Sequence, residues 1–136
     1  MTILSVVPPL PADNADVRAQ LNALHLTDTG NGEAFALLHR DRLRYYDLER
    51  VWYYHFNSIW VPDRHSMEVM RAAKETAQTC LAVARSGADE ERVQYYIKLG
   101  NLPRLRAMIW CARGELAVTR LELQNLRNGD RGKDSR

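Results

Sequence analysis

The residues that most often bind metals or catalyse reactions are few in this 136-residue chain, and their spacing does not group them. The four histidines are His25, His39, His55 and His65. No two of them have the three- or four-residue spacing that would place two ligands on one face of a helix. Cys80 and Cys111 form no Cys-x-x-Cys pair. The sequence therefore predicts no metal site, no cofactor and no enzymatic activity.

One group of titratable residues lies close together in the sequence, namely Asp63, His65 and Glu68. We interpret Asp63 as the cap of a helix and Glu68 as an acidic residue in its first turns, where negative charge is stabilised. These structural roles account for both carboxylates without catalysis. We interpret His55, which lies among aromatic residues, as a hydrogen-bonded core or boundary histidine.

The strongest periodic pattern runs over residues 101–126 and predicts one long helix. If Leu102 is position a of a heptad, position e is arginine four times, at Arg106, Arg113, Arg120 and Arg127. The a series is Leu102, Ile109, Leu116 and Leu123. In a parallel two-stranded coil, Glu115 and Glu122 at position g would face Arg120 and Arg127 of the partner. The pattern predicts a homodimer that associates through Leu116, Leu123, Glu115 and Glu122.

Two other interpretations of this helix remain open. The d positions Ala112 and Thr119 are weak, and Gly114 lies mid-helix, so the segment is also typical of a core helix in a monomer. The four arginines would alternatively contact phosphates of DNA or RNA, although Glu115 and Glu122 would partly cancel their charge. The chain has no spacing typical of a helix-turn-helix, a zinc finger or a glycine-rich phosphate loop.

A second concentration of residues is aromatic. Seven of the eleven aromatic residues lie within sixteen positions: Tyr45, Tyr46, Trp52, Tyr53, Tyr54, Phe56 and Trp60. Their spacing fits one helix over residues 33–60 that buries one broad face. We expect partial exposure of Tyr46, Tyr53, Tyr54 and Trp60, and such residues are typical anchors for a partner. Packing within the monomer, or cover by the N-terminal arm or a second subunit, are the alternatives.

These residues must be positioned by helices, because no segment shows the alternation of a strand. Prolines make residues 1–12 an extended arm. Helices are predicted from Asn14 to about Leu26, over 33–60, from Asp63 to Gly87, from Asp89 to Gly100 and over 101–126. Residues 27–32 are predicted to form a loop, and residues 127–136 a disordered basic tail. The expected fold is all-α, a bundle of four to five helices forming one domain over 13–126.

Composition limits the function classes. The chain is 46% hydrophobic and 26% charged, with a formal net charge of +2 that equals the excess of cations in residues 127–136. The body is thus nearly neutral. No apolar stretch is long enough for a membrane span, and no signal peptide is recognisable, so we expect a cytoplasmic protein that does not contact a membrane.

We predict a non-catalytic protein-binding module, such as an adaptor, regulator or stoichiometric inhibitor, of the kind phages and mobile elements encode. The alternative is a small accessory protein that binds DNA or RNA.

Overall fold

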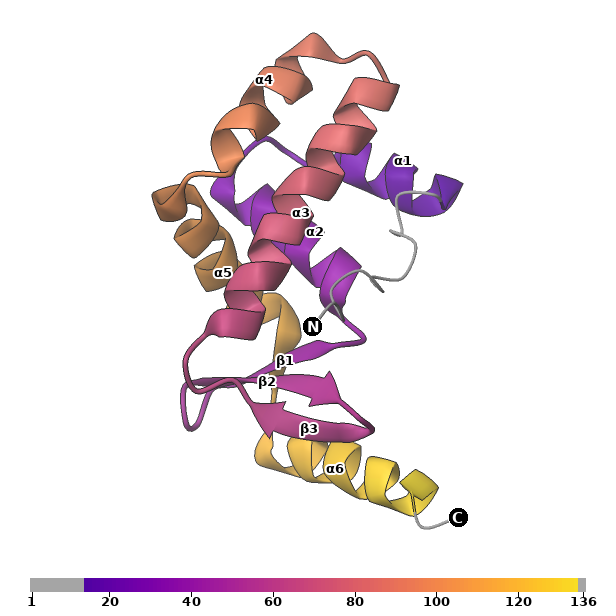
Figure 1. The fold of residues 1–136 in the computed structure, drawn as a ribbon, viewed down its shortest axis with the longest axis vertical. Helices are drawn as coiled ribbons and strands as arrows, with labels where there is room; N and C mark the ends of the chain where they lie inside the picture. The colour runs from indigo at the N-terminus through magenta and orange to yellow at the C-terminus, as the bar shows by residue number, and fades with distance from the viewer. Residues whose placement is uncertain (1–13, 135–136) are drawn as a thin grey trace.

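Three layers make up the fold in the computed structural model, which describes residues 14–134 and side chains up to residue 129 (Figure 1). Helices lie above a small sheet, and one further helix lies below it. The elements in chain order are α1 (Ala15–Ala23), α2 (Asp28–His39), β1 (Leu43–Tyr46), β2 (Val51–Phe56), β3 (Ile59–Pro62), α3 (Met67–Ser86), α4 (Glu90–Leu99), α5 (Leu102–Leu116), β4 (Ala117–Val118) and α6 (Arg120–Asp134). The predicted arm at 1–12 lies outside the described residues.

The all-α prediction is wrong, because residues 14–134 combine six helices with a four-stranded mixed sheet. The strand order is β3-β2-β1-β4. The β1/β2 and β2/β3 pairs are antiparallel, whereas β4 pairs with β1 in parallel, with Tyr45 opposite Ala117.

The predicted helix over 33–60 is confirmed only up to His39, the end of α2, and is wrong beyond it, because the seven clustered aromatic residues belong to strands, and β1 and the first part of β2 are buried on both faces. Tyr45 and Trp52 enter the main core, while their chain neighbours Tyr46 and Tyr53 point to the opposite side. Successive side chains of a strand point to opposite faces, so a strand that is covered on both faces has apolar residues at consecutive positions and no alternation of apolar and polar residues. Asn57 and Ser58 adopt positive φ values of 50° and 67°, as a tight two-residue hairpin turn requires.

Two cores hold the layers together. The main core lies above the sheet and includes Phe35, Tyr45, Met108 and Leu116, all at most 2% exposed. The second core lies below it, where Tyr46, Tyr53 and Trp60 of the sheet pack with Val118 and Leu123. In Figure 1 the helix that covers this lower face is α6. Three of the four aromatic residues expected to be partly exposed, Tyr46, Tyr53 and Trp60, are therefore buried beneath α6, whereas Tyr54 is partly exposed as expected.

The predicted loop at 27–32 is instead the first part of α2. The Thr27 side chain accepts a hydrogen bond from the Gly30 amide at 3.0 Å, which caps the helix. Gly32 is buried where α2 crosses α5, and a Cβ atom there would lie 2.7 Å from the Cys111 Cβ. Gly32 thus permits the close crossing of α2 and α5, and Gly30 permits the close approach of the His25 backbone, so these glycines serve packing and do not mark a loop.

The predicted helix 101–126 is interrupted after Leu116. Ala117 and Val118 form β4, and Thr119 caps a new helix that runs through residues 127–134 of the expected tail. The Thr119 hydroxyl accepts from the Glu122 amide at 3.1 Å, and the Glu122 carboxylate accepts from the Thr119 amide at 2.9 Å. This reciprocal pair is a capping box. The apolar period continues across the break, so periodicity alone does not reveal it.

Replacing Thr119 with alanine is expected to lower the free energy of unfolding by about 1 kcal/mol, because the Glu122 amide loses its acceptor. Urea denaturation measures the change. Thr119→Ser keeps the hydroxyl and serves as the control, with an expected change of less than about 0.5 kcal/mol. Equal losses in the two variants would contradict the capping role.

Candidate functional site

A groove of about 930 Å³ lies where the start of β2, the N-terminal part of α3 and the outer face of α5 meet. We call it the basic groove, because six cationic side chains line it: Arg50, Arg64, Arg71, Lys74, Arg106 and Arg113. Asp63 is the only carboxylate among the residues of this lining. Its two oxygens accept hydrogen bonds from the amides of Glu68 at 3.3 Å and Val69 at 2.9 Å, so its side chain caps α3 as expected, although the helix begins at Met67 with Ser66 as its N-cap residue.

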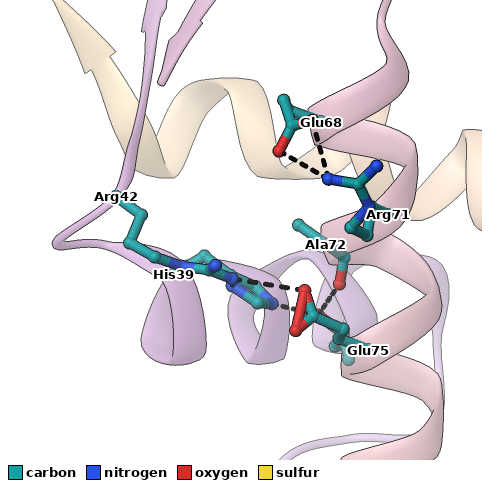
Figure 2. Close-up of polar contacts among 7 residues, drawn as sticks. His39, Arg42, Glu68, Arg71, Ala72 and Glu75 are labelled. Carbon is teal, nitrogen blue, oxygen red and sulfur yellow. Dashed lines mark hydrogen bonds and ion pairs between the residues drawn. The ribbon is translucent and has the colours of Figure 1, made fainter. Parts of the chain in front are cut away.

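Most of the positive charge in the basic groove is not neutralised. Arg71 donates two hydrogen bonds to Glu68, at 2.8 Å and 3.0 Å, as Figure 2 shows. Among the described residues, the other five cations of the groove take part in no ion pair. The groove is therefore a local positive site on a chain whose net charge is only +2.

Trp110 is the aromatic component of the groove. Arg106, Trp110 and Arg113 lie one and two turns apart on α5, so they share one helix face. Trp110 is 66% exposed. The guanidinium carbon of Arg113 lies 4.1 Å from the centre of the Trp110 ring and 4.8 Å from the centre of the Tyr45 ring. Contact with two rings holds Arg113, and through it Trp110, in a defined position.

Two residues of the groove lining carry buried hydrogen-bond donors for which the described residues offer no partner. The donors are Nε1 of Trp52 and Nε of Arg113. An unpaired buried donor costs about 1–3 kcal/mol. Both groups can only donate, so the partner that they require is an acceptor.

A second polar arrangement connects α2 to α3 around His39, which is buried (Figure 2). The Thr76 hydroxyl donates to the Ala72 carbonyl at 2.8 Å, so it accepts from His39 Nε2 at 3.1 Å. Nδ1 of His39 then accepts from Arg42, which also donates to Glu75 at 3.3 Å. This pattern specifies the neutral tautomer with its proton on Nε2. Burial, and secondly the charge of Arg42, lower the pKa of His39 from 6.5 to about 3.

These titratable groups do not form a reactive centre. With a pKa of about 3, His39 does not exchange protons near neutral pH. Burial raises the pKa of the Cys80 thiol to about 12, so the thiolate required of a nucleophile does not form. No group of three or more metal-ligating side chains occurs within residues 14–129, whose side chains the structure describes.

The structure separates the aromatic residues predicted to bind a partner. Tyr46, Tyr53 and Trp60 are 5–8% exposed in the second core. Tyr54 is partly buried against the main core, and its ring lies 6.4 Å from that of Phe56. Because these residues lie on strands and not on the predicted helix over 33–60, the continuous aromatic face that the sequence indicated is not present among the described residues.

The heptad residues are separated in the same way. Arg106 and Arg113 line the basic groove, whereas Arg120 and Arg127 are exposed on α6. Leu116 is buried in the main core and Leu123 in the second core, on opposite sides of the sheet. Glu115 is exposed, and Glu122 is engaged in the cap of α6. A continuous seam through these residues is not present in the folded chain.

Sequence reasoning missed most of the basic groove. Arg50, Arg64, Arg71 and Lys74 come from a turn, a loop and a different helix, and nothing in their spacing connects them. One signal was available on α5, where Arg106, Trp110 and Arg113 follow the i, i+4, i+7 spacing of one helix face. The heptad pattern includes both arginines at position e, but Trp110 occupies neither an a nor a d position.

Comparison with known proteins gives no guide to function. No family model matches this sequence, and no curated protein or solved structure is significantly similar to it. Within the part of the chain that the structure describes, no helix is both long enough and apolar enough to cross a bilayer.

Proposed function

We propose that this chain is a non-catalytic module that binds nucleic acid through phosphate contacts in the basic groove. The observation that supports this most directly is the charge of the groove. Six cations line it, and its single carboxylate already accepts hydrogen bonds from backbone amides. Arginine predominates among the six, and its planar guanidinium suits two-point contacts to phosphate oxygens.

Two further observations favour nucleic acid over an acidic protein segment. Trp110 offers an exposed ring of the kind on which bases stack, beside the cations that would contact the backbone. Arg106 and Arg113 also lie one turn to either side of Trp110 on α5, which places cations where the phosphates next to a stacked base would lie. This proposal keeps the nucleic-acid function considered for the arginine-rich helix and two of its residues, Arg106 and Arg113. The remaining contacts are assigned to other residues of the groove, namely Arg50, Arg64, Arg71 and Lys74.

The expected signature is binding that weakens steeply with salt, because each phosphate contact releases counterions. Fluorescence anisotropy of a labelled oligonucleotide, titrated at 50–200 mM NaCl, measures it. Lys74→Gln combined with Arg106→Gln is expected to weaken binding about ten-fold at low salt and to reduce the slope of log Kd against log salt by about one to two. Both side chains are exposed, so the variant should fold.

Arg120→Gln combined with Arg127→Gln is the matched control, because it removes the same charge from α6, outside the groove. This control is expected to change affinity less than about three-fold. Equal losses in the two double variants would indicate attraction to the whole surface and contradict the groove. A wild-type chain that does not bind at 50 mM salt would rule out the proposal.

The protein-binding interpretation, as adaptor, regulator or inhibitor, stays a prediction, as does the homodimer. The apolar pair Phe56 and Ile59, opposite each other at the β2–β3 hairpin, is about half exposed and is the clearest surface for it. Multi-angle light scattering of the purified chain measures self-association directly.

A further inference from the structure

The ring of Trp110 is unusually placed for a large apolar side chain. It is 66% exposed at the margin of the basic groove, and Arg113 occupies a position 4.1 Å from its centre. Arg113 in turn contacts Tyr45, which is 1% exposed. The exposed ring is therefore tied through a cation to the core, which keeps it oriented and lowers the entropy lost when a flat ligand stacks on it.

The groove beside Trp110 is lined by positive charge. The six cations come from four segments, namely the turn before β2, the loop before α3, α3 itself and α5, so they do not form a single stripe along one helix. A ligand that satisfies this site combines an acceptor-rich, anionic backbone with an apolar ring.

From this combination we infer that the basic groove holds single-stranded nucleic acid, with an unpaired base stacked on Trp110 and the adjoining phosphates beside Arg106 and Arg113. This inference rests on the proposed function and specifies its substrate. In a duplex, both faces of each internal base are covered by neighbouring bases, so Trp110 would find no ring to stack on. In a single strand, base faces and phosphates are both available within one nucleotide.

The test compares a labelled twelve-nucleotide oligo(dT) or oligo(U) with a twelve-base-pair duplex at the same salt concentration. We expect the wild-type chain to bind a single strand at least ten-fold more tightly than the duplex. Trp110→Ala is expected to weaken single-strand binding about ten-fold or more, because one stacking contact is lost. Its affinity for the duplex and the salt dependence of its binding should not change, since no charge is removed.

The variant Trp110→Tyr keeps a ring and is the matched control, with most of the single-strand affinity retained. Because Trp110 is exposed, all variants should share the thermal midpoint of the wild type, which circular dichroism measures. Tryptophan fluorescence gives an independent readout. Trp52 and Trp60 are buried, so quenching by bound oligonucleotide should be largely absent from Trp110→Ala.

The possible outcomes distinguish failure of the single-strand inference from failure of the nucleic-acid proposal on which it rests. Duplex binding as tight as single-strand binding, with no effect of Trp110→Ala, overturns the single-strand inference but leaves the nucleic-acid proposal intact. Binding of poly-glutamate as tightly as oligo(dT) overturns the inference, because the groove would then recognise charge alone. If neither nucleic acid binds at 50 mM salt, both fail.

Discussion

Replacing Gly32 with alanine is expected to lower the free energy of unfolding by about 2–3 kcal/mol. The new Cβ would lie 2.7 Å from the Cys111 Cβ, 2.9 Å from the Cys111 carbonyl carbon and 3.0 Å from the Ala112 nitrogen. Two of these neighbours are backbone atoms of α5, which a side-chain rotation cannot move. The crossing of α2 and α5 would have to open, and a closely packed interior resists that. The clash outweighs the helix propensity that alanine adds, about 1 kcal/mol.

Gly114→Ala is the matched control for this prediction. Gly114 also lies in a helix of the described chain, but a Cβ atom there meets no heavy atom within 4 Å. This variant gains helix propensity without a clash, so its stability should rise by about 0.5–1 kcal/mol. Urea denaturation with unchanged m-values measures both. Two variants that shift in the same direction would show that the crossing is less tight than the distances indicate.

The second large effect is a loss of stability on mild acidification through His39. The fold holds His39 neutral with a pKa of about 3, whereas the unfolded chain takes up a proton near its ordinary pKa of 6.5. Below about pH 6.5 the unfolded state therefore binds more protons than the folded state, and stability falls as pH falls. The slope is up to about 1.4 kcal/mol per pH unit and continues towards pH 3. Between pH 7.5 and pH 5, His39 should contribute a loss of about 2 kcal/mol.

The experiment compares wild type with His39→Gln by urea denaturation at pH 7.5, 6.5, 5.8 and 5.0. Glutamine does not titrate, yet it can accept from Arg42 and donate to Thr76 as the histidine does. Groups that titrate equally in both proteins cancel in the difference. The stability advantage of wild type over the variant should thus shrink by about 2 kcal/mol over this range. A difference that stays constant with pH would contradict a neutral, buried His39.

Helices whose ends are specified locally could be predicted from the sequence. Asp89 and Asn101 cap α4 and α5 as expected, and Gly87 and Gly100 follow the last residues of α3 and α4. The small residues Ala73, Ala77, Cys80 and Ala84 form the buried face of α3, as their spacing indicates. In each case the signal is contained within one element, so no knowledge of distant contacts is needed.

The sheet and the basic groove could not be predicted in this way, because both depend on contacts between distant segments. Tyr45 and Tyr46 are compatible with a helical face until Ala117 and Val118 are known to pair beside them, more than seventy residues along the chain. The groove likewise requires Arg50, Arg64 and Arg106 to converge. The spacing predicts only one part of the groove, the face of α5 that carries Arg106, Trp110 and Arg113. The capping box of Thr119 and Glu122 was a readable sign of the helix break.

The position of β4 and α6 at the end of the chain has a consequence for biosynthesis. Tyr46, Tyr53 and Trp60 leave the ribosome well before Val118 and Leu123, which complete the core below the sheet. During that interval β4 and α6, the described elements that cover this face of the sheet, are not yet available to the nascent chain. Such faces promote association between unfinished chains. The described residues after 116 thus complete the cover of this face, and a chain truncated before residue 117 would leave its aromatic side chains exposed to solvent and prone to association.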